Sequence, residues 1–331
     1  MRFSKKSALL LTACALLLGG CAGQHSPDEK YYLVSVNIKV PYWQAAAAGM
    51  ARAAAEMQVR AELAGPDGYD PKAEQEEFRR IAKLKPAGIL VSAADANLMA
   101  PDIDAAVNAG IPVITMDSDS PDSKRLTFIG TNNYEAGLMG GRLAAKLLQG
   151  KGNVVVLTMP GQPNLDERLH GYQSVFDAQP GIKIVQVVDI QGKPQVAFDS
   201  VASILDKEPK KVDAFVCLEA IAGKEVAEVV NRAKMSDKII VAMDTDQGTL
   251  EWVQKGVIAA TVAQKPYTMA FTGVKMLDEL HHHPLSRLGA NWAEDPFARI
   301  PRSLDTGVTI VDKGSVDLFM KARDTATSGK T

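Results

Sequence analysis

Cysteine is scarce in this chain, with three among 331 residues. Cys14 and Cys21 lie near the N-terminus, which leaves Cys217 alone in the main body of the chain. One thiol cannot form an internal disulfide, so the stability of the main body must rest on a packed core. Cys217 lies in an apolar, strand-like run, and we expect it to be a small buried side chain.

Motifs typical of common enzymes are missing as well. The sequence has no Gly-x-x-x-x-Gly-Lys-Ser/Thr phosphate loop, no Gly-x-Ser-x-Gly nucleophile elbow and no His-Glu-x-x-His zinc motif. The five histidines, at 25, 170 and 281–283, form no set of nucleophile and base. The run at 281–283 ends a predicted helix, where neighbouring side chains diverge, so we expect it to be solvated and to bind no metal. The sequence therefore predicts a protein without cofactor or catalytic activity.

Basic residues are not in excess. The chain has 37 Lys and Arg against 39 Asp and Glu, a formal net charge of −2. A nucleic-acid surface needs clustered Lys and Arg beyond this balance, so no nucleic-acid partner is expected.

The N-terminus has the order of a secretory signal. A short basic segment, Met1–Lys6, precedes an apolar run over 8–18 that is too short to span a bilayer. Leu-Gly-Gly-Cys21 then resembles the bacterial lipobox, whose cysteine takes a lipid and becomes the new N-terminus. We expect residues 1–20 to be a signal peptide, Cys21 to be lipidated and 21–30 to be a tether. The protein would then be exported to the cell envelope or periplasm and anchored to a membrane. The alternative is a plain signal with an incidental cysteine.

From residue 31 onward, short apolar β-rich runs alternate with helical patterns. Apolar strands alternating with helices predict parallel sheets covered on both faces, which is an α/β fold. More than ten strands exceed one comfortable open sheet, so we expect two lobes. The pattern loosens after His281, recovers a strand at 306–311 and a short helix at 316–322, and leaves 325–331 as a flexible tail.

Polar side chains follow the predicted strands at the point where each strand ends. In open α/β sheets, ligands lie beyond the carboxyl ends of the strands. Five residues occupy such positions: Ser92, Asp117, Glu219, Asp244 and Gln264. A single acid at a strand end is as readily a helix N-cap, but five at equivalent places favour a shared ligand. Carboxylates and amides form paired hydrogen bonds with adjacent hydroxyls, as a sugar presents.

Two aromatic residues and one arginine add to this set. Tyr42 and Trp43 follow the first strand, and flat rings suit the C–H face of a sugar; core packing is the alternative. Arg168 follows the loop after a later strand, which favours the cleft over a surface ion pair with Asp166 and Glu167.

Five pieces of the sequence, in order, are shared with one known family. They are Val-Pro-Tyr-Trp43, Ile-Pro-Val-Ile-Thr-Met-Asp117, Arg168-Leu-His-Gly-Tyr-Gln, Val-Ala-Met-Asp244 and Ala-Thr-Val-Ala-Gln264. With these pieces, residues 32 to about 311 resemble the ribose-type (type 1) periplasmic binding proteins of ABC sugar importers. The resemblance implies two Rossmann-like lobes with parallel sheets, joined by three strand crossovers near Thr131, Lys265 and Ser303. It places 31–131 and 266–302 in an N-terminal lobe, and 132–265 and 303–324 in a C-terminal lobe.

The resemblance also implies roles for individual residues. Tyr42 and Trp43 fall on the family's stacking aromatics, and its hydroxyl-binding residues fall on Asp117, Arg168, Asp244 and Gln264.

Several positions depart from the ribose binders. Ser92 and Glu219 stand where those proteins carry Asn, Ser118 stands where they carry Arg, and 189–193 lacks an expected aromatic. By its position in the resemblance, Ser118 is expected to bind the ligand together with the other eight residues. These departures argue against ribose itself, and the acidic balance leaves an amino sugar or a cyclitol open.

The expected function is therefore capture of a sugar or sugar-like polyol by a monomer that closes its lobes and delivers the ligand to an ABC-type permease. A protein that passes its bound state to a membrane sensor would use the same lobes and remains an alternative. A sugar-responsive transcription regulator shares the fold, but it needs a DNA-binding headpiece, and the segment before Tyr31 is read as signal and tether.

Overall fold

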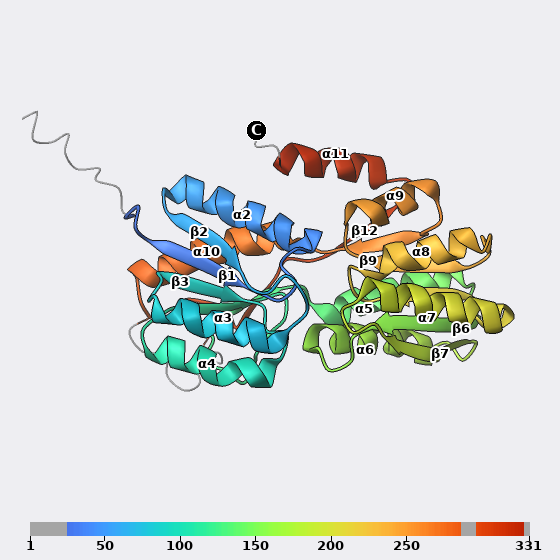
Figure 1. The fold of residues 1–331 in the computed structure, drawn as a ribbon, viewed down its shortest axis with the longest axis horizontal. Coiled ribbons are helices and arrows are strands. Elements are labelled where there is room, and N and C mark those ends of the chain that lie inside the picture. Colours follow the sequence, from blue (N-terminus) through green and yellow to red (C-terminus); the bar gives the residue numbers. More distant parts are fainter. Residues whose placement is uncertain (1–24, 286–295, 328–331) are drawn as a thin grey trace, which may run out of the picture.

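The structure is a computed structural model that describes residues 25–285 and 296–327, and it places two α/β lobes side by side (Figure 1). The predicted signal peptide and Cys21 lie outside the described residues. Each lobe is built around a six-stranded sheet. No helix in the described ranges combines the length and the apolarity needed to cross a bilayer.

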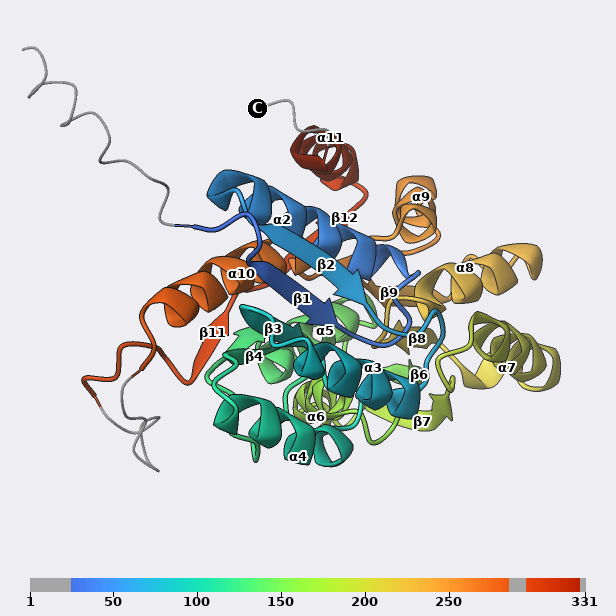
Figure 2. The same ribbon diagram turned by 60° about the vertical axis from the view of Figure 1, so that its left-hand side comes forward.

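The first lobe holds an all-parallel sheet in the order β11-β5-β4-β3-β1-β2. Its strands are β1 (Lys30–Val34), β2 (Arg60–Ala64), β3 (Gly88–Val91), β4 (Val113–Met116), β5 (Phe128–Gly130) and β11 (Ser303–Asp305). The helices that cover it are α2 (Pro41–Met57), α3 (Pro71–Lys83), α4 (Ala96–Asn108) and α10 (Pro266–His282). Helices α2 and α10 pack together on one face and α3 and α4 on the other, and Figure 2 shows β1 and β2 between α2 and α3.

The second lobe repeats this plan with the strand order β12-β10-β9-β8-β6-β7. Its strands are β6 (Gly152–Thr158), β7 (Ile182–Asp189), β8 (Ala214–Cys217), β9 (Ile239–Met243), β10 (Ala260–Ala263) and β12 (Thr309–Asp312), of which only β12 runs antiparallel to its neighbour. Its helices are α5 (Asn133–Leu147), α6 (Pro163–Asp177), α7 (Pro194–Lys207), the 3-10 turn η1 (Pro209–Lys211), α8 (Ala222–Arg232), α9 (Gln247–Lys255) and α11 (Val316–Thr327).

Local sequence explains where these elements begin and why they are buried. Helix α3 starts at Pro71, and the Asp70 carboxylate accepts hydrogen bonds from the backbone N–H groups of Lys72 and Ala73. All four residues of β3, Gly-Ile-Leu-Val, are buried, as expected of a strand covered by helices on both faces. Cys217 is buried at the end of β8, as predicted. The predicted fold class, two parallel-sheet α/β lobes flanked by helices, is confirmed.

The chain passes between the lobes three times: after β5, after β10, and between β11 and β12. The third passage was expected near Ser303, and this expectation is wrong by a few residues. Ser303–Asp305 pairs in parallel with Phe128–Gly130 as the edge strand of the first sheet, so it belongs to the first lobe. Ser-Leu-Asp is too short and polar to be recognised as a strand from its sequence.

The predicted tether and tail also need correction. Lys30 belongs to β1, and the His25 imidazole lies 2.9 Å from the carboxylate of Asp278 in α10, so the described end of the tether is packed on the first lobe. At the other end, α11 continues to Thr327, into the predicted flexible tail.

Candidate functional site

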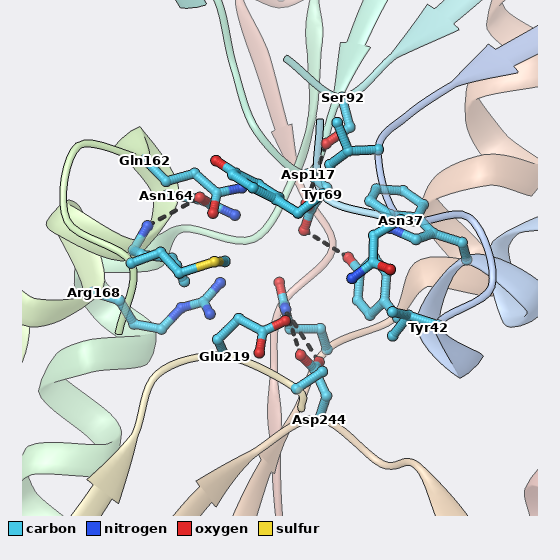
Figure 3. A pocket seen from close by; sticks show the side chains of 17 residues that line it. Asn37, Tyr42, Tyr69, Ser92, Asp117, Gln162, Asn164, Arg168, Glu219 and Asp244 are labelled. Atoms are coloured by element: carbon cyan, nitrogen blue, oxygen red, sulfur yellow. Dashed lines mark hydrogen bonds between the residues drawn. The ribbon is translucent and has the colours of Figure 1, made fainter. Parts of the chain in front are cut away.

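The carboxyl ends of the strands in both lobes meet at one cleft, whose empty volume is about 560 Å³ including its open mouth. Figure 3 shows polar side chains from both lobes pointing into this space. Eight of the nine predicted ligand residues line it: Tyr42, Trp43, Ser92, Asp117, Arg168, Glu219, Asp244 and Gln264.

Asp117 and Asp244 occupy equivalent places in the two lobes. Each follows a central strand, and each has a left-handed backbone with φ of 67°. Their backbone N–H groups bond to the carbonyl oxygens of Ile129 (3.1 Å) and Val262 (2.9 Å) in the neighbouring strands. This conformation is uncommon outside glycine, although Asp tolerates it better than most residues, and such positions cluster at binding sites. The two lobes therefore present matching carboxylates to the cleft from opposite sides.

In the first lobe, neighbouring side chains hold the Asp117 carboxylate in place. The Tyr42 hydroxyl donates to Oδ1 at 2.7 Å, and the Ser92 hydroxyl donates to Oδ2 at 3.3 Å. The Trp43 ring meets the Tyr42 ring edge to face, with centroids 4.9 Å apart, and packs into the core beneath α2. Trp43 thus lines the cleft and also fills the core, while Tyr42 orients a carboxylate besides offering its ring.

In the second lobe, Arg168 is almost fully buried in the wall of the cleft. Its Nε and Nη2 donate to the Asn133 side-chain oxygen at 3.2 and 2.6 Å, and its Nη1 donates to the carbonyl of Leu218. A guanidinium carries five N–H donors, so some remain for a ligand. Glycine brings these partners together: a Cβ at Gly137 of α5 would lie 2.2 Å from the Arg168 carbonyl oxygen in α6.

Gln264 connects the cleft to the strands that cross between the lobes. It lies directly after β10, and its amide nitrogen donates to both oxygens of Asp244, at 3.1 and 3.3 Å. Its amide oxygen accepts from the hydroxyl of Thr131, at the first crossing, at 2.8 Å. Two of the three crossings therefore contact each other and a carboxylate of the cleft.

The cleft holds more negative than positive groups. Three carboxylates, Asp117, Glu219 and Asp244, face one guanidinium, that of Arg168. Burial raises the pKa of Glu219 to about 7, although the Ile221 backbone N–H donates to it at 2.7 Å. Burial also raises the pKa of Asp244 to about 7 and raises that of Asp117. Each of these buried carboxylates has fewer hydrogen-bond donors than it would have in water, so a ligand rich in O–H or N–H groups suits the cleft.

Ser118 is not among the lining residues. It is fully buried, and its hydroxyl has no hydrogen-bond partner within the described protein. The chain turns at Asp117, where φ is 67°, and the Ser118 backbone N–H bonds back to the Met116 carbonyl oxygen at 2.8 Å, so Asp117 lines the cleft while the Ser118 side chain is buried.

Several lining residues were missed by sequence reasoning, among them Asn37, Tyr69, Gln162 and Asn164. Each follows a strand in the chain, so the rule that found Asp117 would have found them if it had been extended along the loops. The first-lobe Tyr69 packs against the core of the second lobe. A Cβ at Gly192 would lie 2.8 Å from the Cβ of Tyr69, so this ring supplies an aromatic beside 189–193 from the opposite lobe.

Two hinged lobes with a polar cleft between them are the architecture of a binding protein. The chain belongs to the periplasmic binding protein family, whose domain matches residues 31–282.

Individual relatives are named for sugars. The chain is similar to the ribose import binding protein RbsB of Bacillus subtilis, with 20% identity over 282 residues that cover 83% of this chain and 90% of the relative. It is 28% identical over 173 residues to a D-apiose import binding protein of Paraburkholderia graminis, covering 52% of this chain and 55% of that protein. Among solved structures, the arabinose-binding protein AraP of Geobacillus stearothermophilus matches with 33% identity and a TM-score of 0.75, covering 88% of this chain and 99% of AraP.

Proposed function

We propose that this chain captures a sugar or a sugar-like polyol between its lobes and delivers it to the permease of an ABC-type importer. One observation carries the proposal: carboxylate, amide and guanidinium groups from both lobes line a single cleft of about 560 Å³. Paired acceptors and donors of this kind match adjacent hydroxyls on a ring. Relatives named as import binding proteins for ribose and apiose support this assignment.

The mechanism is hinge closure on the ligand. Asp117 and Asp244 sit on different lobes, so a ligand that bonds to both contributes more to the closed form than to the open one. Ser92 and Tyr42 orient the first carboxylate, and Gln264 orients the second. Arg168 and Glu219 bond the remaining hydroxyls, and the Tyr42 and Trp43 rings set the plane of the sugar.

A ligand that carries an amine is a second candidate, because three carboxylates in the cleft face one guanidinium. A cyclitol would use the same donors and acceptors without a charge. The test is isothermal titration of the purified protein with pentoses, hexoses, cyclitols and amino sugars. Tight binding of a neutral sugar supports the main proposal, and a preference for amines supports the second. If none of these compounds binds, the proposed function is wrong.

We further propose that the protein is exported, lipidated at Cys21, anchored to a membrane of the cell envelope, and monomeric. Labelling of cells with a radioactive fatty acid tests the lipid. We expect Cys21→Ser to abolish labelling and Cys14→Ser to leave it intact. Labelling that persists in Cys21→Ser would contradict the assignment.

Transport and sensing differ in the partner that reads the closed form. Deleting the permease should abolish uptake of the ligand if the protein serves import. A protein that serves a membrane sensor should instead leave uptake unchanged when it is deleted, and lose only the response to the ligand.

A further inference from the structure

Two histidines and two carboxylates meet at the end of the first lobe that faces away from the cleft. His25 and Glu29 belong to the segment that leads into β1, and Asp278 and His282 belong to the last turns of α10. Figure 1 shows this segment and the end of α10 at the outer edge of the lobe. The three consecutive histidines were expected to be solvated alike, but here His281 and His283 are exposed while His282 is partly buried.

The ligand atoms of this cluster lie close together. His25 Nε2 is 2.9 Å from Asp278 Oδ2, and His282 Nε2 is 3.3 Å from Glu29 Oε1. If one ligand atom is taken from each of His25, Asp278 and His282, the three atoms lie within 4.8 Å of one another. The four side chains expose between 12% and 24% of their surface, so the cluster is sheltered but remains open to an ion from solution.

The hydrogen bonds of His282 leave a lone pair facing an acceptor. Its Nδ1 lies 3.0 Å from the backbone carbonyl oxygen of Asp278, which can only accept, so Nδ1 carries the proton in the neutral ring. In that tautomer Nε2 carries no proton, and its lone pair faces Glu29 Oε1 at 3.3 Å. Both atoms can then only accept a hydrogen bond. The other oxygen of Glu29, Oε2, is buried without a hydrogen-bond partner among the described residues. Either a second proton on the ring or a bound cation satisfies this contact, and a cation would use the Nε2 lone pair and the Glu29 carboxylate together.

A hydrogen bond from the protein core orients the Asp278 carboxylate. The buried hydroxyl of Tyr31 donates to its Oδ1 at 2.9 Å, which leaves Oδ2 toward His25. Metal-binding carboxylates are commonly held by an outer hydrogen bond of this kind, and the carbonyl bonded to His282 Nδ1 has the same effect on the imidazole.

We propose that His25, Glu29, Asp278 and His282 form a site for a divalent transition metal of the zinc class. Zinc takes imidazole nitrogen and carboxylate oxygen at about 2.0–2.2 Å in a tetrahedron, whose ligand atoms are about 3.3 Å apart. The separations of 2.9 and 3.3 Å are already close to that spacing. Calcium and magnesium prefer all-oxygen sites, so two imidazoles select against them.

The bound ion would fix the segment before β1 to α10. It would thereby set the point at which the N-terminal part of the chain leaves the lobe. This role is independent of the ligand cleft, which lies at the opposite ends of the strands.

The test is titration of the purified, chelator-treated full chain with zinc chloride, followed by calorimetry. We expect one zinc ion per chain and no heat from calcium chloride. His25→Ala and His282→Ala should each weaken zinc binding by more than about 100-fold, because even outer-shell partners are worth about 10- to 100-fold. Unchanged melting temperatures of the metal-free variants would show that they fold.

The matched control is His283→Ala, which removes an exposed histidine from the same run but outside the cluster. We expect this variant to bind zinc as the unmodified protein does. Cobalt(II) in place of zinc should give the intense visible absorption of a tetrahedral site, and His25→Ala should remove that absorption. Equal loss of zinc binding in His283→Ala and His25→Ala would assign the ion to the exposed run and overturn the proposal, as would the absence of zinc binding by the unmodified chain.

Discussion

Replacing Asp244 by asparagine tests the cleft most directly. The substitution keeps the size of the side chain and tolerates the left-handed backbone at this position, where φ is 67°. An alanine at the same place would add backbone strain to the loss of the carboxylate. Asp244→Asn therefore removes a negative charge and an acceptor oxygen while it leaves the end of β9 intact.

The magnitude follows from the contacts of the carboxylate. Gln264 donates to both oxygens through one nitrogen, so acceptor capacity remains on the side that faces the cleft. A hydrogen bond to a charged group is worth about 1.5–3 kcal/mol net, and the amide that replaces it presents a donor where an acceptor is needed. We expect a loss of about 2–3 kcal/mol, or about 30- to 150-fold in Kd.

Isothermal titration at pH 8 is the suitable assay, because burial raises the pKa of Asp244 to about 7 and the carboxylate must be ionised. Asp246→Asn is the matched control. It removes the same charge two residues away, outside the cleft, and asparagine can still cap α9 by accepting from the Thr249 backbone N–H. If Asp244→Asn binds the ligand as tightly as the Asp246→Asn control, the Asp244 carboxylate does not contact the ligand.

Three further predictions concern a buried carboxylate of the cleft, a contact across the cleft and a hydrogen bond at the crossings. Burial raises the pKa of Glu219 to about 7, above its unfolded value, so the folded state binds more protons between about pH 4.5 and 7. Glu219 alone should then lower the free energy of unfolding by about 3 kcal/mol as the pH rises through this window. Because the pKa of Asp244 is also raised to about 7, Glu219→Gln should reduce the slope in urea titrations without removing it, and an unchanged slope would contradict the raised pKa of Glu219. Tyr69→Ala removes a ring of the first lobe that packs against the second lobe, so it should weaken ligand binding by about 10-fold. The variant should also have a larger radius of gyration than the unmodified protein in solution scattering. Equal affinity would show that the contact does not favour closure. Thr131→Val removes the donor to Gln264 and should cost about 1 kcal/mol, or about 5-fold in Kd by calorimetry, whereas Thr131→Ser should restore binding.

Much of the fold could be predicted from the sequence because its strands and helices follow strong local patterns. Runs such as Ile239–Met243 are apolar throughout, and Pro71 after Asp70 marks a helix start. Strands β5 and β11 were not predicted, because each has three residues and owes its structure to its neighbours in the sheet. Such short segments carry too little periodicity to be recognised.

The candidate site was predictable where one rule applies, since the residue after a buried strand faces the edge of the sheet. That rule placed Asp117, Glu219, Asp244 and Gln264 at the cleft. It did not decide how far the site extends along a loop, so Tyr69 was missed. Ser118 was included through the family resemblance and not through this rule, and the structure buries it away from the lining of the cleft.

The sequence by itself determined the order of elements and the chemistry at the strand ends, because both follow from local periodicity and from the identity of single residues. Tertiary structure alone decided which distant side chains meet. Tyr69 reaches Gly192 in the other lobe, and His25 reaches Asp278 across more than 250 positions. Such contacts depend on how packed helices and sheets orient whole segments, and no local pattern in the chain encodes that orientation.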